Sequence, residues 1–296
     1  MEAASGSIRV STVSRGRKLR NAVMLGLIGA ALLVAMIPLG AVLVDLVHRG
    51  IHLFTWSFVT KPIPTPRETG PGMGPAVVGT IIITLWATII AVPLGILGAV
   101  YVVEYGASNR LSKVIRFMSD VMAGVPSIVM GLFVYTTFTL HFKERAIGGS
   151  LALACLMLPV VIRSTETMLR LVPQDQREAS RALGASRART TLTVVLPAAL
   201  PGITSGCLLA IARAAGETAP LLFTIGFITA RPNWNVFSGP NTTLSAQIFN
   251  LAASSPYIGG IQRAWTAALT LIVMVLVLTV TARLITSRLS VPRGSH

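Results

Sequence analysis

The sequence predicts an all-α integral membrane protein with six transmembrane helices and both termini in the cytoplasm. The 296-residue chain is 53% apolar and only 12% charged, so it is more apolar and less charged than an average soluble domain. Six apolar stretches are long enough to cross about 30 Å of hydrocarbon. Most of the 25 Lys and Arg residues fall on the side that holds both termini, which the positive-inside rule assigns to the cytoplasm.

The six predicted spans follow a basic N-terminal segment. They lie at Ala22–Val47, Ala76–Val103, Val114–Leu140, Ser150–Leu169, Ile203–Ile228 and Trp265–Ile285. A proline-rich stretch, residues 50–75, is the predicted outer loop after the first span. The first span is longer than the apolar core of a signal peptide, so we expect it to be retained.

These spans divide the chain into three parts. Residues 1–73 hold the basic cytoplasmic N-terminus, the first helix and the outer loop, residues 74–286 form the predicted transmembrane domain, and residues 287–296 are a tail. The last six residues, Val291–His296, are similar to a protease-site remnant, with a native ending as the alternative.

The charge pattern favours a lipid membrane over nucleic acid as the partner. A net charge of +15 is typical of nucleic-acid-binding proteins, but here the basic residues cluster at the ends of apolar spans. Cys155 and Cys207 lie inside apolar runs, where they act as small hydrophobic residues, and the four His residues show no ligand spacing. The sequence also lacks a phosphate-binding loop. We therefore predict no metal site, no catalytic residues and no cofactor bound by this chain.

A charged segment, residues 173–197, interrupts the apolar pattern between the fourth and fifth spans. Asp175 is expected to cap a short helix, with Glu178 reaching back to the cap as in a capping box. Ala179 and Leu183 share a small apolar face, and Gly184 is expected to end the helix in the left-handed conformation. Such a helix suits a groove on a partner protein. The alternative is a solvated basic loop in which Glu178 only caps its own helix.

The fifth span contains a charged pair. Arg213 lies ten residues after Ile203, which predicts a position roughly 15 Å along the helix and near the bilayer midplane. Placing Arg there costs about 2.5–3.5 kcal/mol on insertion scales. Glu217 lies one helical turn further on, on the same face. Two interpretations remain open: a structural ion pair that keeps the bundle in register, or an Arg213 that meets a passing anion.

The anion interpretation explains why a carboxylate stands beside the cation. A guanidinium presents a planar fork of donors that matches phosphate or carboxylate oxygens. Glu217 repels a fully ionised anion, but it accepts a hydrogen bond from the P–OH group of a protonated phosphate, whereas sulfate carries no such donor at neutral pH. Glu217 is also a candidate gate that holds Arg213 while the path is empty.

Two motifs resemble those of a known family. Glu178-Ala179-Ser180, Gly184 and Val194-Val195-Leu196-Pro197 resemble the E-A-A, G, I-x-L-P loop of ABC importer permeases, with Ser180 and Val194 as departures. The run from Ala212 to Thr224, which contains Arg-Ala-Ala-Gly-Glu-Thr-Ala-Pro-Leu-Leu, resembles the signature of the PstA-type permease of the phosphate ABC importer. The resemblance covers roughly residues 74–285.

The resemblance implies a function and a set of partners. It implies an ABC importer permease core of the MetI-like type from the second to the sixth helix, in a bacterial inner membrane. The implied partners are a PstC-type permease, two copies of an ATPase that binds ATP and Mg, and a phosphate-binding protein. The implied anion-translocation residues are Arg213, Glu217 and Thr218. The implied ATPase-coupling residues are Glu178, Ala179, Ser180, Leu183 and Gly184.

Three rival functions remain at this stage. A permease for another oxyanion, such as sulfate or molybdate, satisfies the same physical chemistry. A secondary transporter uses an intramembrane carboxylate as a proton site, although it has no use for a cytoplasmic docking helix. A membrane-embedded enzyme needs a larger set of reactive residues than Arg213 and Glu217 supply.

Overall fold

The computed structural model describes residues 15–65, 68, 70–106, 109–226, 231–253 and 259–289, with side chains placed between residues 16 and 284 of these ranges. In this part of the chain, helices are the sole regular structure. The helices of eight or more residues are α1 (Arg15–Gly50), α3 (Gly74–Val100), α4 (Arg110–Gly124), α5 (Ser127–Val134), α7 (Ala146–Arg170), α8 (Gln174–Ala182), α10 (Leu196–Gly216), α12 (Leu244–Ala253) and α13 (Gly260–Leu289). The ending Val291–His296 lies outside the described residues.

Short elements join these helices. They are α2 (Trp56–Thr60), α6 (Leu140–Phe142), α9 (Arg187–Thr190), α11 (Leu221–Thr224), the 3₁₀ turn η1 (Ile51–Leu53) and the π-helical turns η2 (Tyr101–Tyr105), η3 (Tyr135–Thr139) and η4 (Thr191–Val195). Each π-helical turn continues a neighbouring α-helix without a break. Such turns are rare and occur mostly as single wide turns within α-helices.

The expectation of an all-helical membrane protein is confirmed. Five stretches of the described chain are long and apolar enough to cross a membrane: Gly16–Leu53, Gly74–Tyr105, Ala146–Arg170, Arg187–Gly216 and Gly260–Leu284. A sixth arises if the bent pair Arg110–Gly124 and Ser127–Phe142 counts as one span.

The third predicted span is present as two helices that meet at a sharp bend. Its two halves meet at an angle of 109°. The α4 helix ends at Gly124, Val125 is extended (φ −73°, ψ 128°), and Pro126 precedes α5. A residue before proline is driven out of the helical region by its clash with the proline ring. Pro126 therefore breaks the helix where hydropathy alone predicts an uninterrupted span.

The fifth predicted span is displaced toward the N-terminus. The structure has a helical stretch from Arg187 to Gly216, whereas the sequence predicted Ile203–Ile228. Glu217 is extended (φ −68°, ψ 135°), and the short α11 starts after Pro220. The expectation that Arg213 sits midway along a continuous helix was therefore wrong, because Arg213 lies in the last turn of α10.

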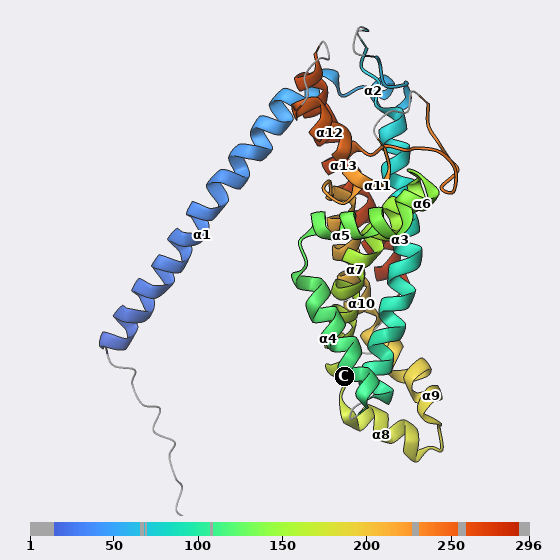
Figure 1. Ribbon diagram of the computed structural model, residues 1–296. Helices are drawn as coiled ribbons and strands as arrows, with labels where there is room; N and C mark the ends of the chain where they lie inside the picture. Colours follow the sequence, from blue (N-terminus) through green and yellow to red (C-terminus); the bar gives the residue numbers. More distant parts are fainter. Residues whose placement is uncertain are drawn as a thin grey trace, which may run out of the picture. The chain divides into compact units, whose positions relative to one another are not determined.

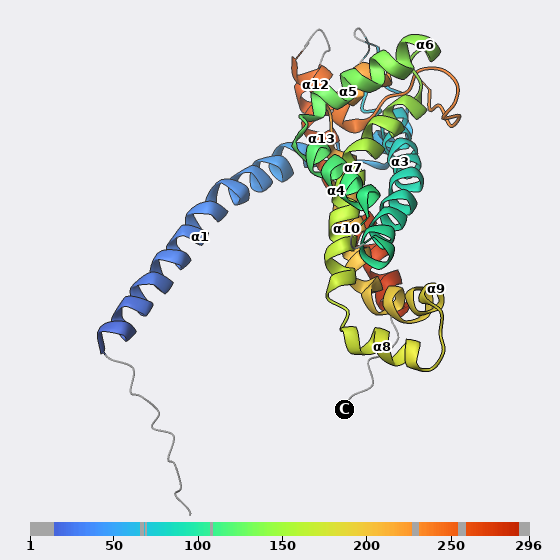
Figure 2. The same cartoon turned by 60° about the horizontal axis from the view of Figure 1, so that its bottom comes forward.

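The chain divides into two compact units after His48. The first contains most of α1. Residues 49–73, grouped with the first helix by the sequence analysis, belong to the second unit. Within this second unit α3, α7 and α10 run lengthwise beside one another, α5 crosses them, and α8 with α9 lies at the end opposite α12 (Figure 1). A view turned by 60° shows the same separation of α8 from α12 (Figure 2).

The core of the second unit lies between α3, α7 and α10. Ile83, Leu153, Met157 and Ile203 are almost completely buried there. A Cβ atom on Gly95 of α3 would lie 2.6 Å from Val161 Cγ1 of α7, so the two helices approach at a distance that glycine alone permits. Small residues at such crossings let membrane helices pack closely. The three packed helices form the frame on which the site is built.

Candidate functional site

A cavity of about 230 Å³ lies where the two broken spans meet. Its walls come from the α4–α5 break, from α7 around Pro159 and from the end of α10. The lining residues are Met122, Ala123, Val125, Pro126, Ser127, Leu156, Met157, Pro159, Val160, Ala210, Arg213, Ala214 and Glu217. The wall is apolar except for Ser127, Arg213 and Glu217, so these three side chains set its chemistry.

The predicted pair of Arg213 and Glu217 is present. Arg213 Nε lies 3.6 Å from Glu217 Oε1. The Arg213 side chain is 73% exposed and the Glu217 side chain 20%, so the cation is largely exposed on the cavity wall while the carboxylate beside it is half-buried. Exposed i,i+4 pairs contribute about 0.3–0.5 kcal/mol. Thr218, the third residue of the predicted set, is half-buried and is not among the lining residues.

The break after α10 is held by contacts from two other elements. A Cβ atom on Gly131 of α5 would lie 2.4 Å from Pro220 Cα, so the two broken segments touch backbone to backbone. Ser245 Oγ of α12 donates to the main-chain oxygen of Glu217 (2.9 Å), and the N–H of Leu221 donates to the oxygen of Thr218 (3.1 Å). Non-helical backbone at membrane depth needs such partners, so the break is a built feature.

The start of α5 also faces this cavity. Ser127 is the first residue of α5 and one of the lining residues. The first N–H groups of a helix lack partners inside the helix and carry partial positive charge. The sequence analysis assigned no role to Ser127 or to this helix end. The signal was present in Pro126, which marks a helix start as readily as a packing kink.

The predicted short helix of the charged segment is α8, but its start differs from the prediction. Pro173 is the N-cap, no side chain caps the helix, and Asp175 lies within the first turn. The capping box of Asp175 and Glu178 was therefore wrong. Asp175 still lies at the positive end of the helix dipole, which stabilises a carboxylate there.

The end of α8 is as predicted. Gly184 has a φ of +84°, which favours glycine because other side chains clash in this region. The N–H of Gly184 donates to Arg181 O (2.9 Å) and the N–H of Ala185 to Ser180 O (3.2 Å). These two bonds form a Schellman motif. Ser180 Oγ also lies 3.0 Å from Thr190 Oγ1 of α9, which closes the segment into a compact hairpin.

The surface of α8 contains exposed residues of the predicted coupling set. Glu178 and Ala179 are exposed, and Leu183 is 90% exposed. An exposed leucine beside a small alanine is an apolar contact surface that the described part of the chain leaves uncovered.

Arg177 and Glu104 form a contact that sequence reasoning missed. Both residues are 6% exposed, and Arg177 Nη1 of α8 pairs with Glu104 Oε1 of η2. Arg177 Nη2 also donates to Leu169 O near the end of α7 (2.6 Å). Arg177 lies in the charged segment at residues 173–197, where the sequence analysis assigned it no partner. The hydropathy pattern carries no signal that joins two residues 73 positions apart.

A second charged cluster joins α4 to α7. Asp120 of α4 pairs with Arg163 of α7. Arg116 Nε of α4 lies 3.1 Å from Glu166 Oε1 of α7. Within α7, Arg170 Nη2 lies 2.8 Å from Glu166 Oε1, and Arg163 Nη1 lies 3.7 Å from Glu166 Oε2. Glu166 is therefore the centre of a network of ion pairs between the two helices.

Comparison with known proteins identifies the family. Residues 91–291 match the family described as binding-protein-dependent transport system inner membrane component. The phosphate transport system permease protein PstA of Mycobacterium leprae is 42% identical over 89% of this chain and 87% of its own length. The corresponding protein of Yersinia pestis is 40% identical over 91% and 90%. The chain belongs to this permease family, in its PstA-type branch.

Solved structures show the same fold for this permease. A bacterial alginate ABC transporter in complex with alginate pentasaccharide-bound periplasmic protein aligns with a TM-score of 0.61 at 12% identity, covering 92% of this chain and 96% of the other. The MetNI methionine ABC transporter aligns with a TM-score of 0.52 at 18% identity, covering 73% and 92%. The predicted ABC permease fold is confirmed. The permease is a multi-pass inner-membrane transport component rather than an enzyme.

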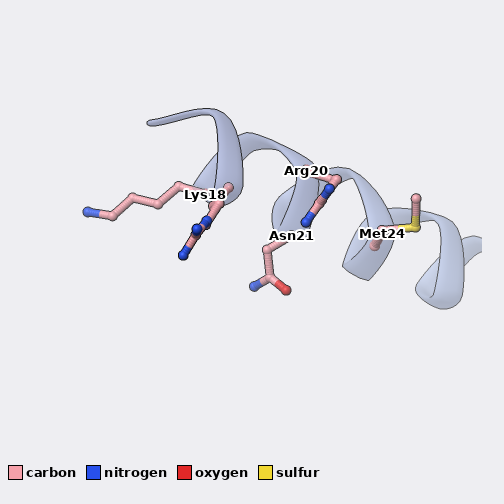
Figure 3. A pocket seen from close by; sticks show the side chains of 5 residues that line it. Lys18, Arg20, Asn21 and Met24 are labelled. Carbon is pink, nitrogen blue, oxygen red and sulfur yellow. The ribbon is translucent and has the colours of Figure 1, made fainter. Parts of the chain in front are cut away.

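The N-terminal end of α1 in this permease carries a separate basic surface. An open hollow of about 380 Å³ is lined by Arg17, Lys18, Arg20, Asn21 and Met24, whose side chains project from successive turns of α1 (Figure 3). Basic residues flanking a span fit the positive-inside pattern. Among the residues that the structure describes, no group of His, Cys, Asp and Glu is arranged to hold a metal ion.

Proposed function

We propose that this chain is the permease subunit of an ATP-driven importer that moves inorganic phosphate from a solute-binding protein into the cytoplasm. The observation that supports this best is the cavity at the two broken spans, with Arg213 on its wall. Arg213, Glu217 and Thr218 are the proposed anion-translocation residues. The relatives named as phosphate transport permeases support phosphate as the passenger.

The magnitude of the Arg213–Glu217 interaction argues against a purely structural role. An exposed pair of this geometry stabilises a helix by only about 0.3–0.5 kcal/mol. Charged residues within membrane spans usually face a partner or a cavity and mark ion paths, and Arg213 lies on a cavity wall. The cation is therefore explained better by a passenger than by architecture.

The cavity presents donors suited to an oxyanion. The Arg213 guanidinium offers a fork of N–H donors, and the start of α5 at Ser127 adds partial positive charge, as half-helix ends do in transporters. Glu217 accepts a P–OH donor, which a protonated phosphate has and sulfate lacks. These groups favour phosphate over sulfate at neutral pH.

The exposed face of α8 is the proposed coupling surface. Glu178, Ala179, Ser180, Leu183 and Gly184 would contact an ATPase subunit, with Leu183 filling an apolar groove on it. The proposed assembly contains a PstC-type permease, an ATPase dimer that binds ATP and Mg, and a phosphate-binding protein. The segment that contains α8 would then face the cytoplasm, with both termini.

Uptake by the reconstituted complex tests the proposal. Vesicles that contain the complex should take up labelled phosphate only when ATP is present on the side of the membrane that carries the ATPase subunits. Sulfate should compete poorly with phosphate for this uptake. Arg213→Gln should lower uptake about 100-fold, because both charge and fork are lost. Arg213→Lys should recover only part of the rate, because it keeps the charge and loses the fork.

Matched controls decide the outcome. Arg110→Gln removes an exposed cation at the start of α4, away from the cavity, and should leave uptake at the parental rate. Parental uptake in an Arg213→Gln complex that assembles would overturn the anion role. Uptake that follows a proton gradient without ATP would favour a secondary transporter, and equal competition by sulfate would favour a general oxyanion permease.

A further inference from the structure

Two arginines from opposite sides of the coupling segment meet adjacent residues of one π-helical turn. Arg177 of α8 pairs with Glu104 of η2, and the guanidinium carbon of Arg187 in α9 lies 5.4 Å from the centre of the Tyr105 ring of η2. Glu104 and Tyr105 are the last two residues of that turn. The α8–α9 hairpin is thus attached to η2 at two points, which we call the η2 clamp.

The first attachment is buried and bridges two helices. Arg177 and Glu104 each keep 8% of their side-chain surface exposed, so water screens their attraction little. Arg177 uses its second terminal nitrogen on Leu169 O at the end of α7 (2.6 Å). One guanidinium therefore joins α8, the η2 end of α3 and the end of α7.

The second attachment is more exposed. Tyr105 is 44% exposed, so the contact of Arg187 with its ring is a weaker cation–π interaction at the surface. Arg187 lies in α9, after the turn at Gly184, whereas Arg177 lies in α8, before that turn. The Arg177 contact is thus the stronger part of the clamp.

The clamp continues directly into the bundle that carries the cavity. The η2 turn extends α3 without a break, and α3 packs against α7 through the close contact of Gly95 with Val161. The α7 helix then contributes Leu156, Met157, Pro159 and Val160 to the cavity wall. A displacement of α8 that pulls on η2 and on the end of α7 therefore reaches the α7 side of that wall through packed helices.

We propose that Glu104 and Arg177 are positioning residues through which motion of the coupling helix enters the membrane bundle, with Tyr105 and Arg187 as a weaker second contact. The proposal deepens the proposed function and rests on its coupling step. Without the clamp, α8 keeps its chain link to α7 through Leu171–Pro173 and its contact with α9, but it loses its attachment to η2 and hence to α3. Motion of α8 is then passed on less completely to the α7 side of the cavity wall, and more ATP is hydrolysed per phosphate moved.

Paired substitutions separate transmission from folding. Arg177→Met alone leaves the Glu104 carboxylate buried without its partner, which impairs assembly. The double variant E104L/R177M replaces both charges by apolar groups of similar volume, so assembly should recover. Transmission should not recover, because an apolar contact lacks the directional bridge to Leu169 O.

The measurement is phosphate taken up per ATP hydrolysed by the full complex in vesicles. This ratio should fall about tenfold in E104L/R177M, whereas ATP hydrolysis stimulated by the loaded binding protein should remain. A tenfold fall is near the upper end of the coupling losses caused by substitutions that contact neither ligand. An assembled double variant with the parental ratio would overturn the proposal, because the pair would then be structural only.

Two further variants keep the test decisive if the double variant does not assemble. Arg177→Lys keeps the charge but has one donor group for two acceptors, and it should lower the ratio about threefold without loss of assembly. Tyr105→Leu should lower it by less than Arg177→Lys. An unchanged ratio in both variants would equally overturn the proposal.

The parental complex distinguishes this inference from the proposed function. If it shows no ATP-dependent phosphate uptake, the proposed function itself fails. If it does and the clamp variants keep its ratio, only the clamp fails. Arg110→Met, which removes an exposed arginine of α4 outside the clamp, is the matched control and should keep the parental ratio.

Discussion

Two arginine–glutamate pairs in this permease have opposite surroundings. The pair of Arg213 and Glu217 is formed within four residues at the end of α10, with the arginine side chain 73% exposed on a cavity wall. The pair of Arg177 and Glu104 joins residues 73 positions apart, and both side chains are 8% exposed. The guanidinium of Arg177 already has two partners in the chain, whereas that of Arg213 retains most of its surface.

The difference shows that the same kind of ion pair has different consequences when it is buried and when it is exposed. In a buried pair, separation of the partners leaves an uncompensated charge away from water, so the two residues stay in contact. In an exposed pair the attraction is weak, so a stronger ligand displaces it. Burial of Arg177 therefore favours the proposed positioning role, and exposure of Arg213 favours the proposed contact with an anion.

The largest expected effect is on stability. Arg177→Met should lower the free energy of unfolding by about 3–5 kcal/mol, because Glu104 is left buried and unpaired. Arg213→Met should change it by less than about 0.5 kcal/mol, because its side chain is exposed in this chain. Thermal unfolding of the purified permease in detergent measures both. Equal losses in the two variants would remove the distinction between the pairs.

A smaller effect is expected on anion selectivity. Glu217→Gln should reduce the preference for phosphate over sulfate by about tenfold, because a neutral amide no longer disfavours the fully ionised anion. Competition of labelled phosphate uptake by sulfate measures the change. Asp175→Gln, an exposed carboxylate of α8, should leave the selectivity unaltered even if it changes the rate. A Glu217→Gln complex with parental selectivity would assign Glu217 to pairing alone.

A third effect, again on stability, concerns how the two helices that carry the arginines end. Gly184→Ala should cost about 1–2 kcal/mol of stability, because alanine is strained at a φ of +84°. Gly216→Ala should be close to neutral, because a Cβ there meets no atom within 4 Å and its φ is not positive. The difference in unfolding midpoint between the two variants is the measurement. A neutral Gly184→Ala would argue against a rigid Schellman end at α8.

Local chemistry made much of the site predictable. The pairing of Arg213 with Glu217 follows from their i,i+4 spacing, and the left-handed end of α8 follows from Gly184. Average hydropathy continues through the breaks at Pro126 and after Gly216, so hydropathy alone does not place them. The start of α8 was misplaced by two residues, because Pro173 serves as the N-cap where Asp175 was expected.

The sequence by itself determined that this protein is a helical membrane permease, since hydrophobic length, charge asymmetry and short motifs are properties of neighbouring residues. The sequence also located the charged segment at residues 173–197 and the pair of Arg213 and Glu217. Only the tertiary structure decided that Arg213 faces a cavity and that Arg177 is clamped to Glu104. Those outcomes depend on which helices pack together, and packing joins residues that no local pattern relates.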